Sequence, residues 1–235
     1  VGEYLNRVEK EISAITRNRR VGDFQSTAEV IDVVKEKYYR SISGGVKYSG
    51  VPSGFARLDS ITNGWQKGDM IVLAARPSVG KTAFALNLGL NAATIFDKTV
   101  AIFSLEMPSE QLVKRMLSSK GAVQGSKLKN GYLDNRDWNN LYDAAQELQQ
   151  AKIFLDDSST IRMSDIFSKC RKLKSEHGLD LVIIDYLQLI TSSSRSSGDN
   201  RQQEVSEISR SLKALARELD VPVIALSQLS RGVET

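Results

Sequence analysis

The sequence predicts an α/β fold in which a mainly parallel β-sheet is flanked by helices and preceded by a helical linker. From residue 70 onward, short runs rich in valine and isoleucine recur without alternating polar residues, which is typical of strands buried on both faces. Longer stretches with apolar residues at helical spacing separate these runs. This alternation of strand and helix is that of a parallel sheet covered by helices.

Length and composition indicate a globular protein. The chain has 235 residues, of which 41% are apolar and 26% charged, which suits one to two folded domains. No apolar run approaches the about 20 residues that a membrane span needs, and the start of the chain is charged, so we expect no membrane partner. A net charge of +4 tolerates a polyanionic partner without requiring one.

The chain has one cysteine and one histidine, which argues against a disulfide, a cysteine-cluster zinc site and histidine-based catalysis. Cys170 occupies an apolar position of a predicted helix, so we expect a buried core thiol. His177 precedes a glycine at the predicted end of that helix, so we expect a helix-end role.

Two helices are predicted ahead of the sheet. The first is marked by Leu5, Val8, Ile12 and Ile15. The second starts at a capping box in 26–29 and carries an apolar stripe of Val30, Val33, Val34 and Tyr38. Residues 41–45 contain two serines and two glycines, which indicates a flexible joint. We therefore assign 1–22 to the end of a helical amino-terminal region, 23–48 to a linker helix and joint, and 49–235 to the α/β domain.

The elements of the α/β domain follow from the same patterns. Strands are expected at 70–74, 100–104, 153–155, 181–184 and 222–226, and helices near 82–96, 109–119, 135–150, 164–176 and 201–219. The stretch 191–200 is rich in serine with arginine and glycine, so it is expected to be a loop.

A phosphate-binding loop is predicted at 75–82, between a strand and a helix. It ends in Gly-Lys-Thr and offers backbone N–H groups, a cation and a hydroxyl. Lys81 would reach the β- and γ-phosphates, Thr82 would ligate Mg²⁺, and Gly80 would let the backbone approach closely. The candidate phosphate-binding residues are Ala75, Arg76, Pro77, Ser78, Val79, Gly80, Lys81 and Thr82. The generic pattern begins with glycine, and here Ala75 takes that position.

Three further side chains follow predicted strands. Asp185 ends an apolar strand and would lie beside Mg²⁺, as in nucleotide-hydrolysing proteins with such a loop. Glu106 follows another strand and would activate the attacking water; the alternative is that it is only an acid at the start of the next helix. Gln228 ends a further strand with an amide that can donate to a γ-phosphate.

Five segments together resemble the ATPase domain of DnaB-type replicative helicases. They are Val-Pro-Ser-Gly-Phe with Leu-Asp in 51–59, the loop 75–82, Ser-Leu-Glu-Met in 104–107, Ile-Asp-Tyr-Leu-Gln in 184–188 and Leu-Ser-Gln-Leu-Ser-Arg in 226–231. Alanine at position 75 is normal for that family, and the resemblance covers about residues 24–235. It implies a RecA-like P-loop NTPase fold that uses ATP and Mg²⁺, with Glu106 as general base and Gln228 as γ-phosphate sensor; Asp185 would hold the metal partly through water.

The same resemblance implies a ring-shaped hexamer that moves along single-stranded DNA and unwinds duplex at the replication fork. Helix 27–40 would pack on the neighbouring subunit, and a primase and a helicase loader would be partners. Candidate DNA contacts are Arg195 within the loop 191–200, Arg201 directly after it, and Arg231. A solvated loop without DNA contacts is equally compatible with the sequence. The expected location is the cytoplasm of a bacterium, or of the host for a phage protein.

The resemblance also implies a continuation beyond residue 235, because the family has a DNA-contacting loop, a further strand and an arginine finger after the sensor glutamine. We therefore expect the segment by itself to bind nucleotide, hydrolyse it slowly and not unwind DNA. Two other functions stay open. A recombination or clock-type ATPase would share the phosphate loop, although 105–107 and 185–188 favour a helicase. A nucleotide-bound assembly module would not need Glu106.

Overall fold

The computed structural model describes residues 26–43, 48–186, 190–191 and 201–229. The chain divides into two compact units, Val1–Lys47 and Tyr48–Thr235, which are described separately. The expected helix in residues 3–20 lies outside the described residues, as do 192–200 of the expected loop and the end of the chain from 230.

Helix α2 (Thr27–Ser43) is the described element of the first unit. It begins with the predicted capping box, because Glu29 N donates to Ser26 Oγ at 3.3 Å and Ser26 N donates to Glu29 Oε2 at 3.1 Å. The helix continues past the predicted end at residue 40 to Ser43, so the first part of the expected joint is helical. Its apolar residues Val30, Ile31, Val33 and Val34 are exposed in the chain.

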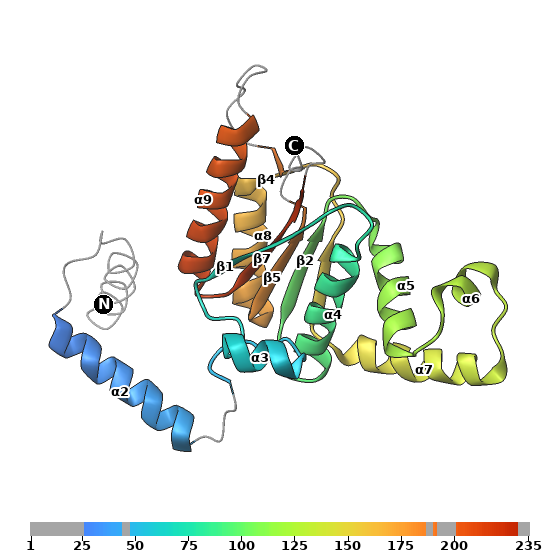
Figure 1. Cartoon of the computed structure of the whole chain (residues 1–235), viewed down its shortest axis with the longest axis horizontal. Coiled ribbons are helices and arrows are strands. Elements are labelled where there is room, and N and C mark those ends of the chain that lie inside the picture. Colours follow the sequence, from blue (N-terminus) through green and yellow to red (C-terminus); the bar gives the residue numbers. More distant parts are fainter. Residues whose placement is uncertain (1–25, 44–47, 187–189, 192–200, 230–235) are drawn as a thin grey trace, which may run out of the picture. The chain divides into compact units, whose positions relative to one another are not determined.

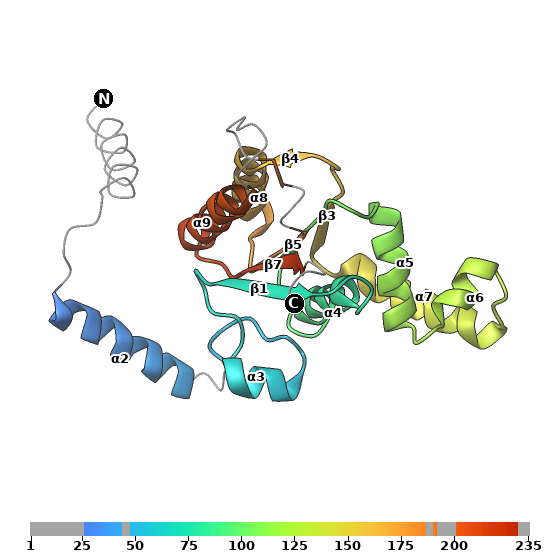
Figure 2. The ribbon, with the colours of Figure 1, turned by 45° about the horizontal axis from the view of Figure 1, so that its top comes forward.

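A five-stranded sheet forms the centre of the second unit (Figures 1 and 2). Its strands are β1 (Met70–Ala75), β2 (Val100–Ser104), β3 (Ile153–Asp156), β5 (Leu181–Asp185) and β7 (Val223–Gln228). Their order is β1-β7-β5-β2-β3, and every neighbouring pair is parallel. The prediction of a parallel sheet is therefore confirmed.

Seven helices of this unit are described. They are α3 (Ala56–Thr62), α4 (Lys81–Thr94), α5 (Ser109–Lys120), α6 (Gly125–Asn130), α7 (Asn135–Gln150), α8 (Met163–His177) and α9 (Arg201–Leu219). Helices α8 and α9 cover one face of the sheet and α4 covers the other, as Figure 2 shows. Helix α3 precedes β1, and helices α4 to α9 lie in the connections between parallel strands, as such sheets require.

Strand residues alternate between the two helical layers. On β5, Val182 and Ile184 pack in the cluster that contains α8 and α9, whereas Leu181 and Ile183 pack in the cluster that contains α4 and α5. Successive side chains of a strand point to opposite faces, and both faces are covered here. This packing explains why the strands read as continuous apolar runs in the sequence.

Four short elements were not predicted. Helices α3 and α6 have seven and six residues, too few for a helical repeat of apolar positions to be evident. Strands β4 (Ile161–Arg162) and β6 (Ile190–Thr191) pair with each other in a separate two-stranded sheet. Thr191, expected at the start of a loop, therefore belongs to a strand whose pairing depends on a partner distant in sequence.

Candidate nucleotide-binding site

The predicted site residues lie at the carboxyl edge of the sheet. Because all five strands are parallel, their carboxyl ends meet at one edge, where ligands of open α/β sheets bind. The phosphate loop leaves β1, Glu106 follows β2, Asp185 ends β5 and Gln228 ends β7. These four strands are consecutive in the order β1-β7-β5-β2, so the sheet brings together segments that are far apart in the sequence.

The loop from 76 to 80 is exposed and turns sharply into α4. Ser78 has a φ of 64° and Gly80 a φ of 97°, both in the left-handed region. For Gly80 this conformation explains the residue type, because side chains other than glycine are strained there. The first N–H groups of α4 follow directly, and the amino terminus of a helix attracts phosphate through these donors and the helix dipole.

Lys81, Thr82 and Asp185 converge at the base of this loop. Thr82 Oγ1 donates a hydrogen bond to Asp185 Oδ2 at 2.5 Å, and Lys81 Nζ lies 3.9 Å from Asp185 Oδ1. The Asp185 carboxylate is buried, and its Oδ1 accepts no hydrogen bond from any residue that the structure describes. A buried carboxylate oxygen beside a hydroxyl is the kind of oxygen donor that Mg²⁺ takes, so these two residues fit that metal.

The sequence did not indicate Tyr186 as part of this arrangement. Its ring centroid lies 5.1 Å from Lys81 Nζ, a distance at which a cation is attracted to an aromatic face. The motif 184–188 contains Tyr186 but assigned it no role in the site.

Glu106 lies beside Asp185 across the sheet. The pairing of β2 with β5 aligns Ser104 with Asp185, and Leu105 N donates to Asp185 O at 2.8 Å. Glu106 itself is exposed. The backbone of Glu106 therefore comes directly after the hydrogen bond that joins Leu105 to Asp185, next to the predicted metal ligand.

Gln228 lies beside the start of the phosphate loop. It pairs in register with Ala75 on β1, and Leu229 N donates to Ala75 O at 3.1 Å. The two residues are distant in the chain, and only the insertion of β7 between β1 and β5 makes them neighbours. A side chain at this position borders the phosphate loop, as a γ-phosphate sensor would need to do.

The candidate DNA contacts are not brought into the site by the described part of the chain. Arg195 and Arg231 lie outside the described residues, and Arg201 begins α9 with a side chain that is not described. Among the described residues no group of three histidine, cysteine, aspartate or glutamate side chains could hold a metal by itself. The described helices include none that is both long and apolar enough to cross a bilayer.

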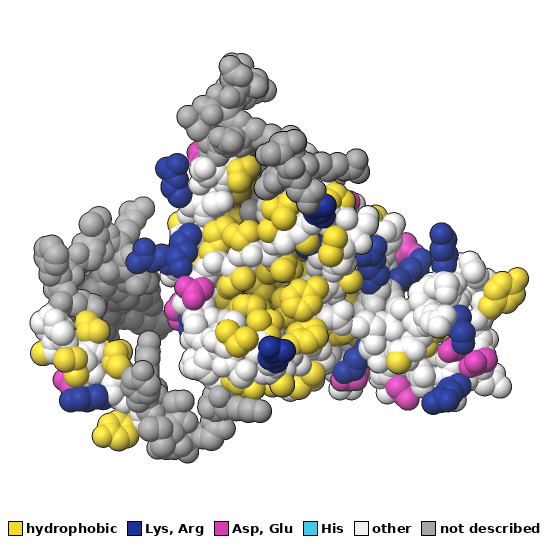
Figure 3. All heavy atoms as spheres, in the orientation of Figure 1, with side chains coloured by type: hydrophobic (Ala, Val, Ile, Leu, Met, Phe, Trp, Pro, Cys, Tyr) yellow, Lys and Arg dark blue, Asp and Glu magenta, His cyan; other side chains and the backbone are white. Residues whose placement is uncertain are grey.

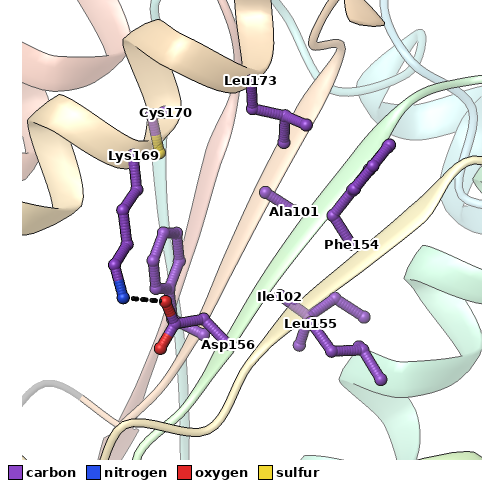
Figure 4. Close-up of a pocket in the computed structure, with 9 residues that line it drawn as sticks. Ala101, Ile102, Phe154, Leu155, Asp156, Lys169, Cys170 and Leu173 are labelled. Carbon is purple, nitrogen blue, oxygen red and sulfur yellow. Dashed lines mark hydrogen bonds and ion pairs between the residues drawn. The ribbon is translucent and has the colours of Figure 1, made fainter.

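Cys170 is a buried core thiol, as predicted, and lies at a separate cavity. The cavity, of about 160 Å³, is partly open to solvent, is lined by residues of β2, β3 and α8, and has the Lys169–Asp156 ion pair at one side (Figure 4). Burial, and to a lesser extent the Asp156 carboxylate, raises the pKa of Cys170 to about 12. The thiol is therefore protonated at neutral pH and is not a nucleophile. His177 is the last residue of α8, also as predicted.

Apolar side chains gather on the face of the second unit that Figure 3 shows. Exposed large apolar residues of this unit include Phe55, Val72 and Val79. Val72 lies on β1, which is an edge strand of the five-stranded sheet in the part of the chain that the structure describes. Exposed apolar area of this kind is typical of surfaces that become covered in an assembly.

The family model of the DnaB-like helicase C terminal domain matches residues 50–235 of this chain. This chain belongs to the DnaB-like helicase family. The sequence resemblance is thereby confirmed, and the family favours the helicase over the recombination or clock-type alternative.

Curated relatives and solved structures agree with this assignment to the DnaB-like family. The chain is 50% identical over 234 residues to the replicative DNA helicase DnaC of Bacillus subtilis (strain 168). This match covers 100% of this chain and 51% of the relative. It is 50% identical over 230 residues to the replicative DNA helicase DnaB of Geobacillus stearothermophilus, and this match covers 98% of this chain and 50% of the relative. The chain thus spans about half the length of these relatives.

Two solved structures confirm the RecA-like ATPase fold. One, described as an ATPase domain, superposes with a TM-score of 0.81 at 39% identity and covers 90% of this chain and 74% of that one. The other is a DnaB-like replicative helicase described with its interactions with primase; its TM-score is 0.77 at 37% identity, covering 97% and 54%.

Proposed function

We propose that this DnaB-like chain supplies the ATP-hydrolysing motor of a hexameric replicative helicase, which moves along single-stranded DNA and unwinds duplex. The observation that carries the proposal is the meeting of the phosphate loop, Asp185, Glu106 and Gln228 on four consecutive parallel strands. A nucleotide-bound assembly module would need the loop and Asp185 alone. The position of Glu106 beside Asp185 supports a hydrolytic site.

In this proposal each residue has a separate role. The backbone N–H groups of residue 76 and residues 78–82, with the Lys81 ammonium, would bind the β- and γ-phosphates. Thr82 would hold Mg²⁺ directly, and Asp185 would hold it partly through water. Bound Mg²⁺ would neutralise charge on the phosphates. Glu106 accepts the proton of the attacking water, and Gln228 donates its amide to the γ-phosphate. Pairing of Gln228 with Ala75 would couple that amide to the loop.

The wider assembly belongs to the same proposal. The exposed apolar stripe of α2 supports a role in joining subunits, because such a stripe requires burial. A primase is proposed as a partner from the solved relative described with primase. A helicase loader, the DNA contacts at Arg195, Arg201 and Arg231, and a cytoplasmic location remain proposals from family membership.

Unwinding of a forked duplex tests the proposed function. A version of the protein extended at its carboxyl end, as in its longer relatives, should separate the strands of a fork when it is assembled with ATP. The segment by itself should not do so, and neither should a Lys81→Ala variant of the extended protein. Formation of joint molecules between homologous DNAs, without unwinding, would instead support a recombination ATPase. Assembly with ATP but neither hydrolysis nor unwinding would support the assembly module.

A further inference from the structure

One buried side chain, that of Ser104, closes the backbone of residues 104–107 into a turn, and this turn carries Glu106. Ser104 Oγ donates to Met107 O at 2.8 Å and accepts from Met107 N at 3.2 Å. The serine is the last residue of β2 and is only 1% exposed. One hydroxyl therefore satisfies both backbone groups of Met107 and confines Leu105 and Glu106 to a two-residue turn.

The two ends of this turn are attached to neighbouring strands. At its start, Leu105 N donates to Asp185 O at 2.8 Å. After its end, Ser109 N, at the beginning of α5, donates to Asp157 Oδ2 at 2.8 Å, just beyond β3. This hydrogen bond holds the pKa of Asp157 below its usual value.

Glu106 depends on this backbone for its place. Its side chain is exposed, and its carboxylate makes no hydrogen bond or ion pair with another described residue. A general base has to stand within hydrogen-bond reach of the water that it deprotonates. With no partner on the carboxylate in the described chain, the turn is what directs the side chain.

We propose that Ser104 is a positioning residue for Glu106, and that Asp157 supports it by holding the far end of the same turn. The inference rests on the proposed function, since it assumes that Glu106 is the general base. It concerns the placement of the base alone. Nucleotide binding at Lys81 and Thr82 should therefore not require either residue.

A double-mutant cycle tests this inference. In single-turnover ATP hydrolysis by the assembled protein, Ser104→Ala should lower the rate by about 10- to 100-fold, because a small misplacement of a reacting group has costs of that order. In a Glu106→Gln background, the same change should have almost no further effect. Affinity for ADP should stay within about twofold, since the cradle is unchanged. Ser118→Ala, which removes a hydroxyl donor to Val123 O elsewhere on α5, is the matched control and should leave the rate unchanged.

Asp157 provides a second pair of variants in case Ser104→Ala does not fold. Asp157 is exposed, so its replacement should leave the fold intact. Asp157→Ala should slow hydrolysis, and Asp157→Asn, which keeps an acceptor oxygen for Ser109 N, should restore most of the rate.

Equal losses from Ser104→Ala with and without Glu106 would overturn the inference and leave the proposed function standing. Unchanged rates in both Ser104→Ala and Asp157→Ala would do the same. A Glu106→Gln variant that hydrolyses ATP at the normal rate would overturn the general-base assignment, and the inference with it.

Discussion

The hydroxyl of Thr82 and the carboxylate of Asp185 share a hydrogen bond of 2.5 Å across 103 positions of sequence. Thr82 begins the helix after the phosphate loop, and Asp185 ends a strand in the middle of the sheet. These are the two oxygen ligands proposed for Mg²⁺. Their contact means that the fold itself brings the two proposed ligands together.

Lys81 and Glu106 should have separable effects. Lys81→Ala should nearly abolish ATP binding, because it removes the cation at the phosphates. Glu106→Gln should preserve binding and lower hydrolysis by about 10²–10⁴-fold, the usual contribution of a general base. Isothermal titration for affinity and single-turnover hydrolysis for rate measure the two effects. Equal losses of affinity in both variants would contradict the division of roles.

Gly80→Ala should weaken nucleotide binding. A residue other than glycine at a φ of 97° costs roughly 1–2 kcal/mol, and the strain falls on the loop that is proposed to bind phosphate. Gly131→Ala is the control: its φ is 74°, and, as at Gly80, an added Cβ would meet no atom within 4 Å. Both variants should unfold at lower denaturant concentration, and Gly80→Ala alone should raise the dissociation constant for ATP. A similar rise in Gly131→Ala would show that the effect is global.

Helix α2 should dock on another subunit through its apolar stripe. Val30 and Val34 are 41% and 42% exposed and lie one turn apart on the same face. Replacing both with glutamate should shift hexamers to monomers in sedimentation velocity, because charges on that face resist burial. Lys35→Gln, a change at an exposed residue of the same helix, should leave hexamers intact. The second unit should stay folded in both variants. A double variant that remains hexameric would refute the docking.

Cys170 should be unreactive in the folded protein and should make folding sensitive to high pH. Burial raises its pKa from an ordinary value near 9 to about 12, so the folded state keeps a proton that the unfolded state loses in that interval. Stability should therefore be unaffected below about pH 9 and fall as the pH rises towards 12. Because the chain has one cysteine, the rate of labelling by a thiol reagent reports on it alone. Rapid labelling of the native protein at pH 8 would contradict the burial.

Much of this architecture could be predicted because its signals are local. The five central strands were expected within two residues of their observed bounds, since each is a continuous apolar run. The Gly-Lys-Thr ending of the loop likewise identified the amino terminus of α4, because it is also a signal of adjacent residues. Some short-range contacts still escaped prediction: the buried carboxylate of Asp59 accepts hydrogen bonds from Ser53 N at 2.7 Å and Gly54 N at 3.1 Å, and nothing in the Pro-Ser-Gly motif by itself indicated that contact.

The sequence by itself determined the five strands of the central sheet and its longer helices, and it predicted which loop would bind phosphate, because periodicity and turn residues act over a few positions. Only the tertiary structure decided which strand ends are neighbours. Gln228 lies beside Ala75, and Glu106 follows the residue that pairs with Asp185, because the strand order is β1-β7-β5-β2 rather than the order along the chain. That order depends on how both faces of the sheet are buried under α4, α8 and α9, a balance among residues distant in the sequence.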